Sequence, residues 1–250
     1  MAITSFQRYE KKFMLTKMQY DALIPRLLEY MSPDEYCKDG KQYSIYNIYY
    51  DTAHDSLIRH SLAKPYYKEK LRLRSYTIPR SRDDKVFLEL KKKIGGIVNK
   101  RRVVLTLGEA YDLLERGSIP KTEGYMSKQV MNEILYFLKC NKVYPKVYIS
   151  YERKAFFGKD NREFRITFDK QITTRRDEVY LEKGCYGNQL LDKGQYLMEI
   201  KILDAMPLWL TSILSELKIY TTSFSKYGTE YKRYCLEQGR NREIREGSAC

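Results

Sequence analysis

The sequence has 250 residues, of which 43% are hydrophobic, so we expect one large folded domain rather than a disordered chain. Lysine and arginine outnumber aspartate and glutamate to give a formal net charge of +14. This charge predicts an anionic partner, which would be a nucleic acid, a membrane surface or a phosphorylated small molecule. The two histidines and five scattered cysteines argue against zinc sites and Ser-His or Cys-His triads, and they favour a cytoplasmic protein with reduced thiols.

The first half of the chain combines strand and helix patterns. A strand is expected over 8–15, and apolar residues at helical spacing from Tyr20 to Met31 predict a helix with Thr16 as its N-cap. Three further strands are expected over 68–76, 85–93 and 98–105, followed by a short helix over about 109–115.

The second half repeats this alternation. An apolar stripe from Val130 to Leu138 predicts a helix with Ser127 as a candidate N-cap. Strands are expected over 147–155, 162–169 and 197–203, then a helix opened by Pro207 and a last helix over about 228–237. We expect a single domain over 1–238 and a flexible polar tail over 239–250, and no apolar stretch is long enough to span a membrane.

The seven expected strands share one pattern, with charged residues on one parity and apolar residues on the other, which places the charges on one face of a sheet. The charged parity includes Arg8, Glu10, Lys12, Lys68, Lys70, Arg72, Arg74, Glu89, Lys91, Lys100, Arg102, Arg153, Glu163, Arg165, Glu199 and Lys201. An antiparallel sheet with one solvated face would also explain this alternation. Because the charges are mostly cationic and seven strands suffice for closure, we predict an α+β fold: a closed antiparallel β-barrel around a charged tunnel, with helices packed outside.

Eight segments in this order carry a resemblance to a known family: RYEKKF (8–13), KLRLRSY (70–76), FLELKKK (87–93), VNKRRVVL (98–105), YERKAF (151–156), REFRITFD (162–169), LMEIKI (197–202) and SFSKYG (223–228). Together they resemble the catalytic VTC domain (vacuolar transporter chaperone). That domain is a polyphosphate polymerase of the triphosphate tunnel metalloenzyme, or CYTH-like, superfamily.

The resemblance implies roles for individual residues. It assigns phosphate binding to Lys12, Arg72, Arg74, Lys91, Lys100, Arg102, Arg153, Arg165, Lys201 and Lys226, of which Arg72, Arg74, Lys91 and Lys226 would be catalytic. It assigns Mn²⁺ or Mg²⁺ to Glu199, with Glu10 and Glu89 as further candidate ligands. Two positions depart from the pattern. Arg8 stands at the first glutamate of the superfamily's E-x-E-x-K motif, and Ser223 stands where family members carry a second lysine.

The function implied is an ATP:polyphosphate phosphotransferase that is metal dependent and moves the γ-phosphate of ATP onto a growing inorganic polyphosphate chain inside the tunnel. Arginine forks and compact lysine charges are the groups that bind phosphate oxygens, which agrees with this chemistry. Two alternatives remain, a tunnel-type inorganic or nucleoside triphosphatase and a non-catalytic polyphosphate-binding domain. No nucleic-acid partner is expected, because no RNA-binding aromatic signature or helix-turn-helix is recognisable. A membrane or export partner is left open.

Overall fold

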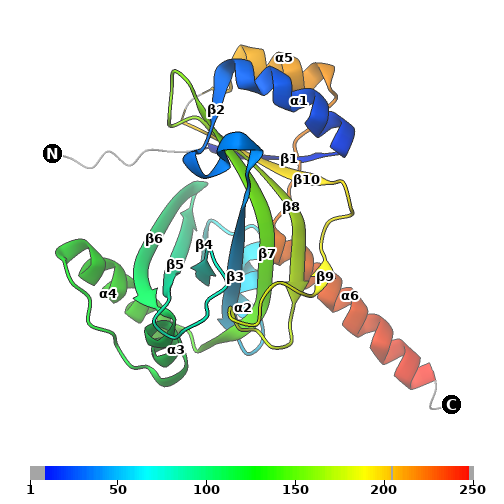
Figure 1. Cartoon of the computed structure of the whole chain (residues 1–250). Coiled ribbons are helices and arrows are strands. Elements are labelled where there is room, and N and C mark those ends of the chain that lie inside the picture. The colour runs from blue at the N-terminus through cyan, green and yellow to red at the C-terminus, as the bar shows by residue number, and fades with distance from the viewer. Residues whose placement is uncertain (1–8, 204, 248–250) are drawn as a thin grey trace.

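The computed structural model describes residues 9–203 and 205–247, with side chains as far as residue 240 (Figure 1). Arg8 therefore lies outside the described residues. The strands are β1 (Tyr9–Leu15), β2 (Met31–Pro33), β3 (Tyr43–Thr52), β4 (Tyr67–Ser75), β5 (Lys85–Ile94), β6 (Ile97–Thr106), β7 (Val143–Gly158), β8 (Arg165–Arg175), β9 (Asn188–Gln189) and β10 (Tyr196–Ile202). The helices are α1 (Lys17–Tyr30), the 3-10 helix η1 (Glu35–Gly40), α2 (Ser56–Leu62), α3 (Leu107–Arg116), α4 (Tyr125–Cys140), α5 (Leu208–Glu216) and α6 (Lys226–Gly247).

The strands form one antiparallel sheet in the order β1-β10-β8-β7-β3-β4-β5-β6, with β2 added beside β7 and β9 beside β8. The sheet is strongly curved, and its end strands β1 and β6 do not pair with each other in the described structure (Figure 1). The predicted closed barrel is therefore wrong, because the sheet is open.

The edge of β1 that faces away from β10 is partly occupied by a later segment of the chain. Thr221 forms an isolated antiparallel bridge with Phe13, and the Thr222 amide donates a 2.7 Å hydrogen bond to the Lys12 carbonyl. These contacts occupy main-chain groups that a closing strand would need. Side chains still meet across the opening, since Glu10 on β1 lies 3.7 Å from Lys91 on β5. The charged faces of these two strands therefore look toward each other, and we call this concave side the inner face.

The outer face of the sheet is apolar and covered by helices. Helices α3 and α4 pack over the strands from β3 to β6, where a buried cluster includes Leu73, Leu88 and Ile134. Helices α1 and α5 pack over β1, β10 and β8, where a second cluster includes Leu23, Ile200 and Leu210 (Figure 1). The alternation thus places its apolar parity against the helices, as expected, and leaves the charged parity on the inner face.

Helix boundaries follow local capping chemistry. Thr16 and Thr106 cap α1 and α3 with complete capping boxes, which stabilise the first turn by satisfying free amides. Helix α4 begins at Tyr125 after Gly124, so the predicted cap at Ser127 is wrong. Helix α6 runs from Lys226 to Gly247, and the prediction of a loose tail over 239–250 falls partly on residues outside the described ones. None of the helices in the described ranges has the length and apolar composition of a membrane span.

Candidate anion-binding site

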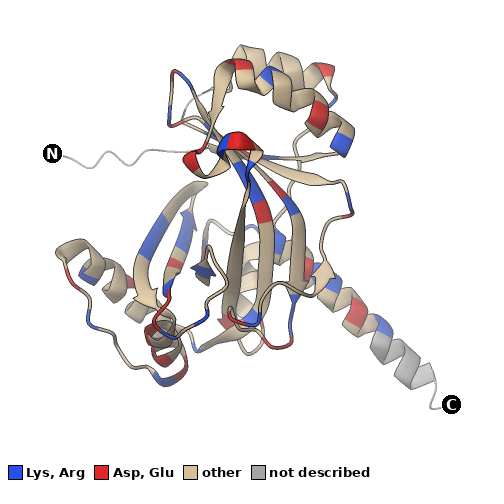
Figure 2. Ribbon diagram, in the orientation of Figure 1, with Lys and Arg blue, Asp and Glu red and all other residues tan. Residues whose placement is uncertain are grey.

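The inner face carries two groups of charged side chains, and Figure 2 shows the lysine and arginine positions along the sheet. The first group, the Glu89 cluster, contains Arg72 and Arg74 from β4, Glu89 from β5, and Lys100 and Arg102 from β6. Strand register builds this cluster, because Glu89 is paired with Arg72 on one side and with Arg102 on the other. Directly opposed residues in an antiparallel sheet point to the same face.

The Glu89 carboxylate is fully buried and is surrounded by cations. Its oxygens lie 2.5 Å from Arg72 Nε and 2.6 Å from Lys100 Nζ, and they accept a 2.6 Å hydrogen bond from Arg102 Nε. Burial opposes ionisation, but Arg72, Arg74 and Lys100 together hold the pKa of Glu89 well below its usual range. Four cationic side chains thus share one carboxylate, which leaves a positive excess that an anion would neutralise.

The two arginines of β4 have different surroundings. Arg74 is buried and donates hydrogen bonds to Asn47 Oδ1 (2.8 Å) and the Tyr151 hydroxyl (3.1 Å). Arg72 donates to the Tyr49 hydroxyl at 3.3 Å. Burial raises the pKa of a tyrosine, yet the Arg72 and Arg74 charges outweigh it and lower the pKa of Tyr49 to about 8. The positive charge of the cluster therefore also favours ionisation of the neighbouring tyrosine.

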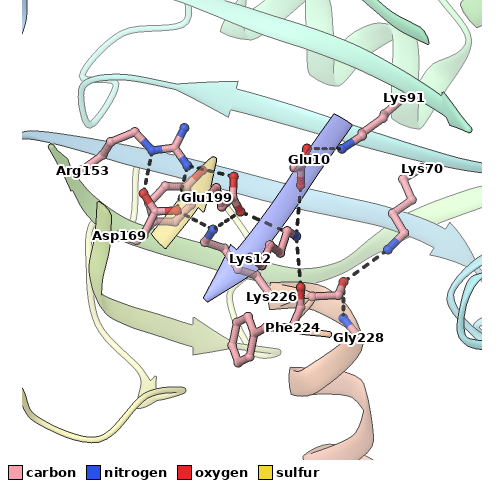
Figure 3. Close-up of polar contacts among 12 residues, drawn as sticks. Glu10, Lys12, Lys70, Lys91, Arg153, Asp169, Glu199, Phe224, Lys226 and Gly228 are labelled. Carbon is pink, nitrogen blue, oxygen red and sulfur yellow. Dashed lines mark hydrogen bonds and ion pairs between the residues drawn. The ribbon is translucent and has the colours of Figure 1, made fainter. Parts of the chain in front are cut away.

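The second group, the Glu199 cluster, contains Glu10 and Lys12 from β1, Arg153 from β7, Asp169 from β8, Glu199 from β10 and Lys226 at the start of α6 (Figure 3). Arg153 holds Asp169 in a bidentate pair of 2.6 and 2.7 Å. Lys226 Nζ lies 2.5 Å from Asp169 and 3.3 Å from Glu199. Burial opposes the ionisation of Glu199, but Lys226, Lys12 and Arg153 hold its pKa well below the usual range.

The segment before α6 joins this cluster to the other side of the opening (Figure 3). Lys12 Nζ donates to the Phe224 carbonyl at 3.0 Å, and Lys70 Nζ on β4 donates to Ser225 Oγ at 3.5 Å. Tyr151 connects the two clusters, because its hydroxyl accepts from Arg74 while its ring lies 4.4 Å from Lys226 Nζ. The two clusters therefore belong to one continuous charged surface.

Three lysines lie between the clusters: Lys70, Lys91 and Lys201. Burial, reinforced by nearby cations that include Lys91, lowers the pKa of Lys70 and of Lys201 to about 8. For Lys201, the charges of Glu199 and Glu10 only partly offset that effect. Partly buried ammonium groups with so little counter-charge are suited to receive an anionic ligand.

The structure brings most of the predicted site residues together. Arg72, Arg74, Lys100 and Arg102 surround Glu89, Lys12, Arg153 and Lys226 surround Glu199, and Lys91 and Lys201 lie between. Arg165 stands apart from both groups, donating to the Tyr43 hydroxyl at 3.4 Å and lying 3.6 Å from Asp34.

Two residues of this surface were not assigned a role in the site from sequence. Asp169 shares the parity of Arg165 and Thr167 at the end of the same charged segment, so its spacing already indicated the inner face. Lys70 likewise shares the parity of Arg72 and Arg74. Both lie in segments that carry the family resemblance, but the resemblance assigned neither of them a role.

The carboxylates fit a divalent cation only in part. No group of three or more His, Cys, Asp or Glu side chains suited to a metal ion occurs among the described residues. Glu89 lies in the other cluster, so it is not brought to Glu10 and Glu199. Those two carboxylates do share Lys12 Nζ, at 3.3 and 3.6 Å. One or two carboxylates completed by substrate phosphates is the usual setting for Mg²⁺, so this pair fits a metal that binds together with a phosphate ligand.

Comparisons with known proteins give one family match and several similar solved structures. The family model described as VTC domain matches residues 7–235. A candidate adenylate cyclase from Bacillus halodurans has a similar structure, with a TM-score of 0.52 and 15% identity over 88% of this chain and 95% of that one. A candidate adenylate cyclase from Vibrio parahaemolyticus gives a TM-score of 0.48 at 12% identity over 91% and 99% of the two chains. No curated protein matches the sequence.

Proposed function

Because the chain belongs to the VTC domain family, we propose that it is a metal-dependent phosphotransferase that moves the γ-phosphate of ATP onto a growing inorganic polyphosphate chain. Family membership supports a phosphate-related function in general. The observation that carries the specific proposal is the Glu89 cluster, in which four cations converge on one buried carboxylate. A triphosphate, with about four negative charges, would neutralise this excess.

Each cluster has a separate task in the proposed reaction. The arginine and lysine side chains around Glu89 hold the triphosphate of ATP, with Arg72 and Arg102 aligned by their bonds to the carboxylate. Lys12, Lys201 and Lys226 hold the end of the polyphosphate chain near Glu199. Phosphoryl transfer depends on alignment and on neutralising charge, so a terminal phosphate attacks directly and no side-chain nucleophile is needed.

Glu10 and Glu199 are the residues that would hold Mn²⁺ or Mg²⁺, which when bound would stabilise negative charge on the transferred phosphoryl group. Lys12, which now lies between these two carboxylates, would then release them and remain available to phosphate. Glu89 keeps the cationic side chains of its own cluster in place.

The decisive experiment is incubation of the protein with ATP and Mn²⁺, followed by separation of the products. Long polyphosphate chains and ADP are expected. Free phosphate without chains would indicate a triphosphatase, and cyclic AMP with pyrophosphate would indicate a cyclase like those named among the structural neighbours. If ATP is not consumed, the result would indicate a non-catalytic polyphosphate-binding domain. Arg72→Ala should abolish chain synthesis, whereas Arg116→Ala, an exposed arginine on α3, should not.

A further inference from the structure

A row of four aromatic side chains borders the Glu89 cluster at one end of the inner face. It runs from Tyr36 on η1 to Tyr43 on β3, Tyr76 just after β4 and Phe87 on β5. Successive ring centroids are 6.2, 6.3 and 5.4 Å apart. Phe87 is paired with Arg74, so it points to the same face as the cations. We call these four residues the aromatic rim.

The rim is joined directly to the Glu89 cluster by Arg102. The Arg102 guanidinium lies 4.6 Å from the Phe87 ring centroid and donates to the Tyr76 hydroxyl at 3.0 Å. The same side chain donates to Glu89, at the centre of the cluster. Farther along the row, Arg165, which lies outside both clusters, donates to the Tyr43 hydroxyl. A ligand whose phosphates contact Arg102 would therefore place its next atoms beside aromatic rings.

The ring orientations leave stacking surface available. Interplanar angles along the row are 67°, 56° and 75°, so the rings meet edge to face or tilted rather than covering one another. Tyr36 is 71% exposed and Tyr76 is 37% exposed.

We propose that the aromatic rim binds the nucleobase of a nucleoside triphosphate whose phosphates lie on the Glu89 cluster. The inference rests on the proposed function and assigns the part of the site that would bind the nucleoside of the donor. A planar base gains stacking energy on tyrosine faces, and an adjacent arginine adds a cation–π contribution. Because stacking tolerates any base, the rim selects nucleoside triphosphates over inorganic polyphosphate as the donor without fixing the base identity.

The test compares two probes that differ only in the nucleoside. Binding of ATP and of inorganic tripolyphosphate is measured by calorimetry, in the same Mg²⁺ buffer, for the wild-type protein and three variants. Tyr36→Ala removes the most exposed ring of the rim, and Tyr36→Phe keeps the ring without the hydroxyl. The matched control is Tyr136→Ala, because Tyr136 is 70% exposed on α4, away from the rim.

ATP affinity should fall about 5- to 160-fold in Tyr36→Ala, the range that stacking energies imply, and Tyr36→Phe should restore most of it. Tripolyphosphate affinity should be unchanged in every variant. If Tyr36→Ala leaves ATP affinity unchanged, or weakens both probes equally, the rim does not bind the base. In either case tight tripolyphosphate binding by the wild-type protein would still support the anion site. Failure of the wild-type protein to bind either probe would overturn the proposed function as well.

Discussion

Binding of polyphosphate should draw protons from solution, and the lysines between the two clusters set the amount. Lys70 and Lys201 each have a pKa near 8 in the free protein, because burial and neighbouring cations disfavour their charged forms. A bound polyanion supplies the missing counter-charge and raises both values toward or above the ordinary lysine value. The ligand therefore binds more tightly to the protonated protein, and its affinity falls as pH rises through 8.

The uptake follows from the fraction protonated before binding. At pH 8 Lys70 and Lys201 are each about half protonated, so together they should take up about 1 proton on saturation. Burial lowers the pKa of Lys100 to about 7, so this lysine should add nearly 1 more proton if the ligand also covers the Glu89 cluster, whereas at pH 6 the total uptake should be only about 0.1. Calorimetry in two buffers with different ionisation enthalpies measures this number directly. Lys70→Met keeps the apolar stem and removes one titrating group, so it should lower the uptake at pH 8 by about 0.5 proton.

Equal proton uptake at pH 6 and pH 8 would refute the reasoning, because it would show that the protons are taken up by groups other than these lysines. Unchanged uptake in Lys70→Met would remove this lysine from the anion site. Lys139→Met provides the control, since that lysine lies in the last turn of α4, outside both clusters.

Three further outcomes are expected. Arg72→Ala should abolish turnover and shift the melting temperature by less than about 2 °C, whereas Arg74→Ala should lower it by about 2–10 °C, because Asn47 and Tyr151 lose a buried partner. Glu199→Gln should retain polyphosphate binding in calorimetry but lose at least about 100-fold in turnover across a Mn²⁺ titration. Near-normal turnover would show that Glu199 is not a metal ligand. The pKa of Asp169 is lowered, despite its burial, by Arg153 and Lys226, so its stabilising effect is complete above about pH 4 and lost as pH falls below it. Urea unfolding should therefore show a weaker loss of stability between pH 5 and pH 3 in Asp169→Asn than in wild type.

The charged surface could be predicted from sequence because it depends on local alternation. Once the strands of 68–105 pair as hairpins, parity alone places Arg72, Glu89 and Arg102 side by side. The resemblance to the VTC domain is likewise confirmed, by the family match over residues 7–235. The features that depend on short-range sequence pattern could therefore be predicted.

Two features could not be predicted from local pattern: whether the sheet closes into a barrel, and the existence of the central strand β3. Whether β1 meets β6 depends on Thr221 and Thr222, which occupy the edge of β1 from the far end of the chain. Strand β3 pairs with both β4 and β7, yet its segment YSIYNIYYDT is rich in tyrosine and isoleucine and lacks the charged alternation. Its β-branched and aromatic content was the available signal.

The pairing of β1 with β10 has a consequence for how the chain is made. The strands β3 to β6 are neighbours in sequence and in the sheet, so they can pair as soon as they leave the ribosome. Strand β1 is synthesised first but must wait for residues 196–222 before its partners exist. During that interval it is an unpaired strand, and such strands invite aggregation. Glu10, Lys11 and Lys12 are charges of both signs in the middle of this strand, and they would keep the nascent segment soluble until its partners arrive.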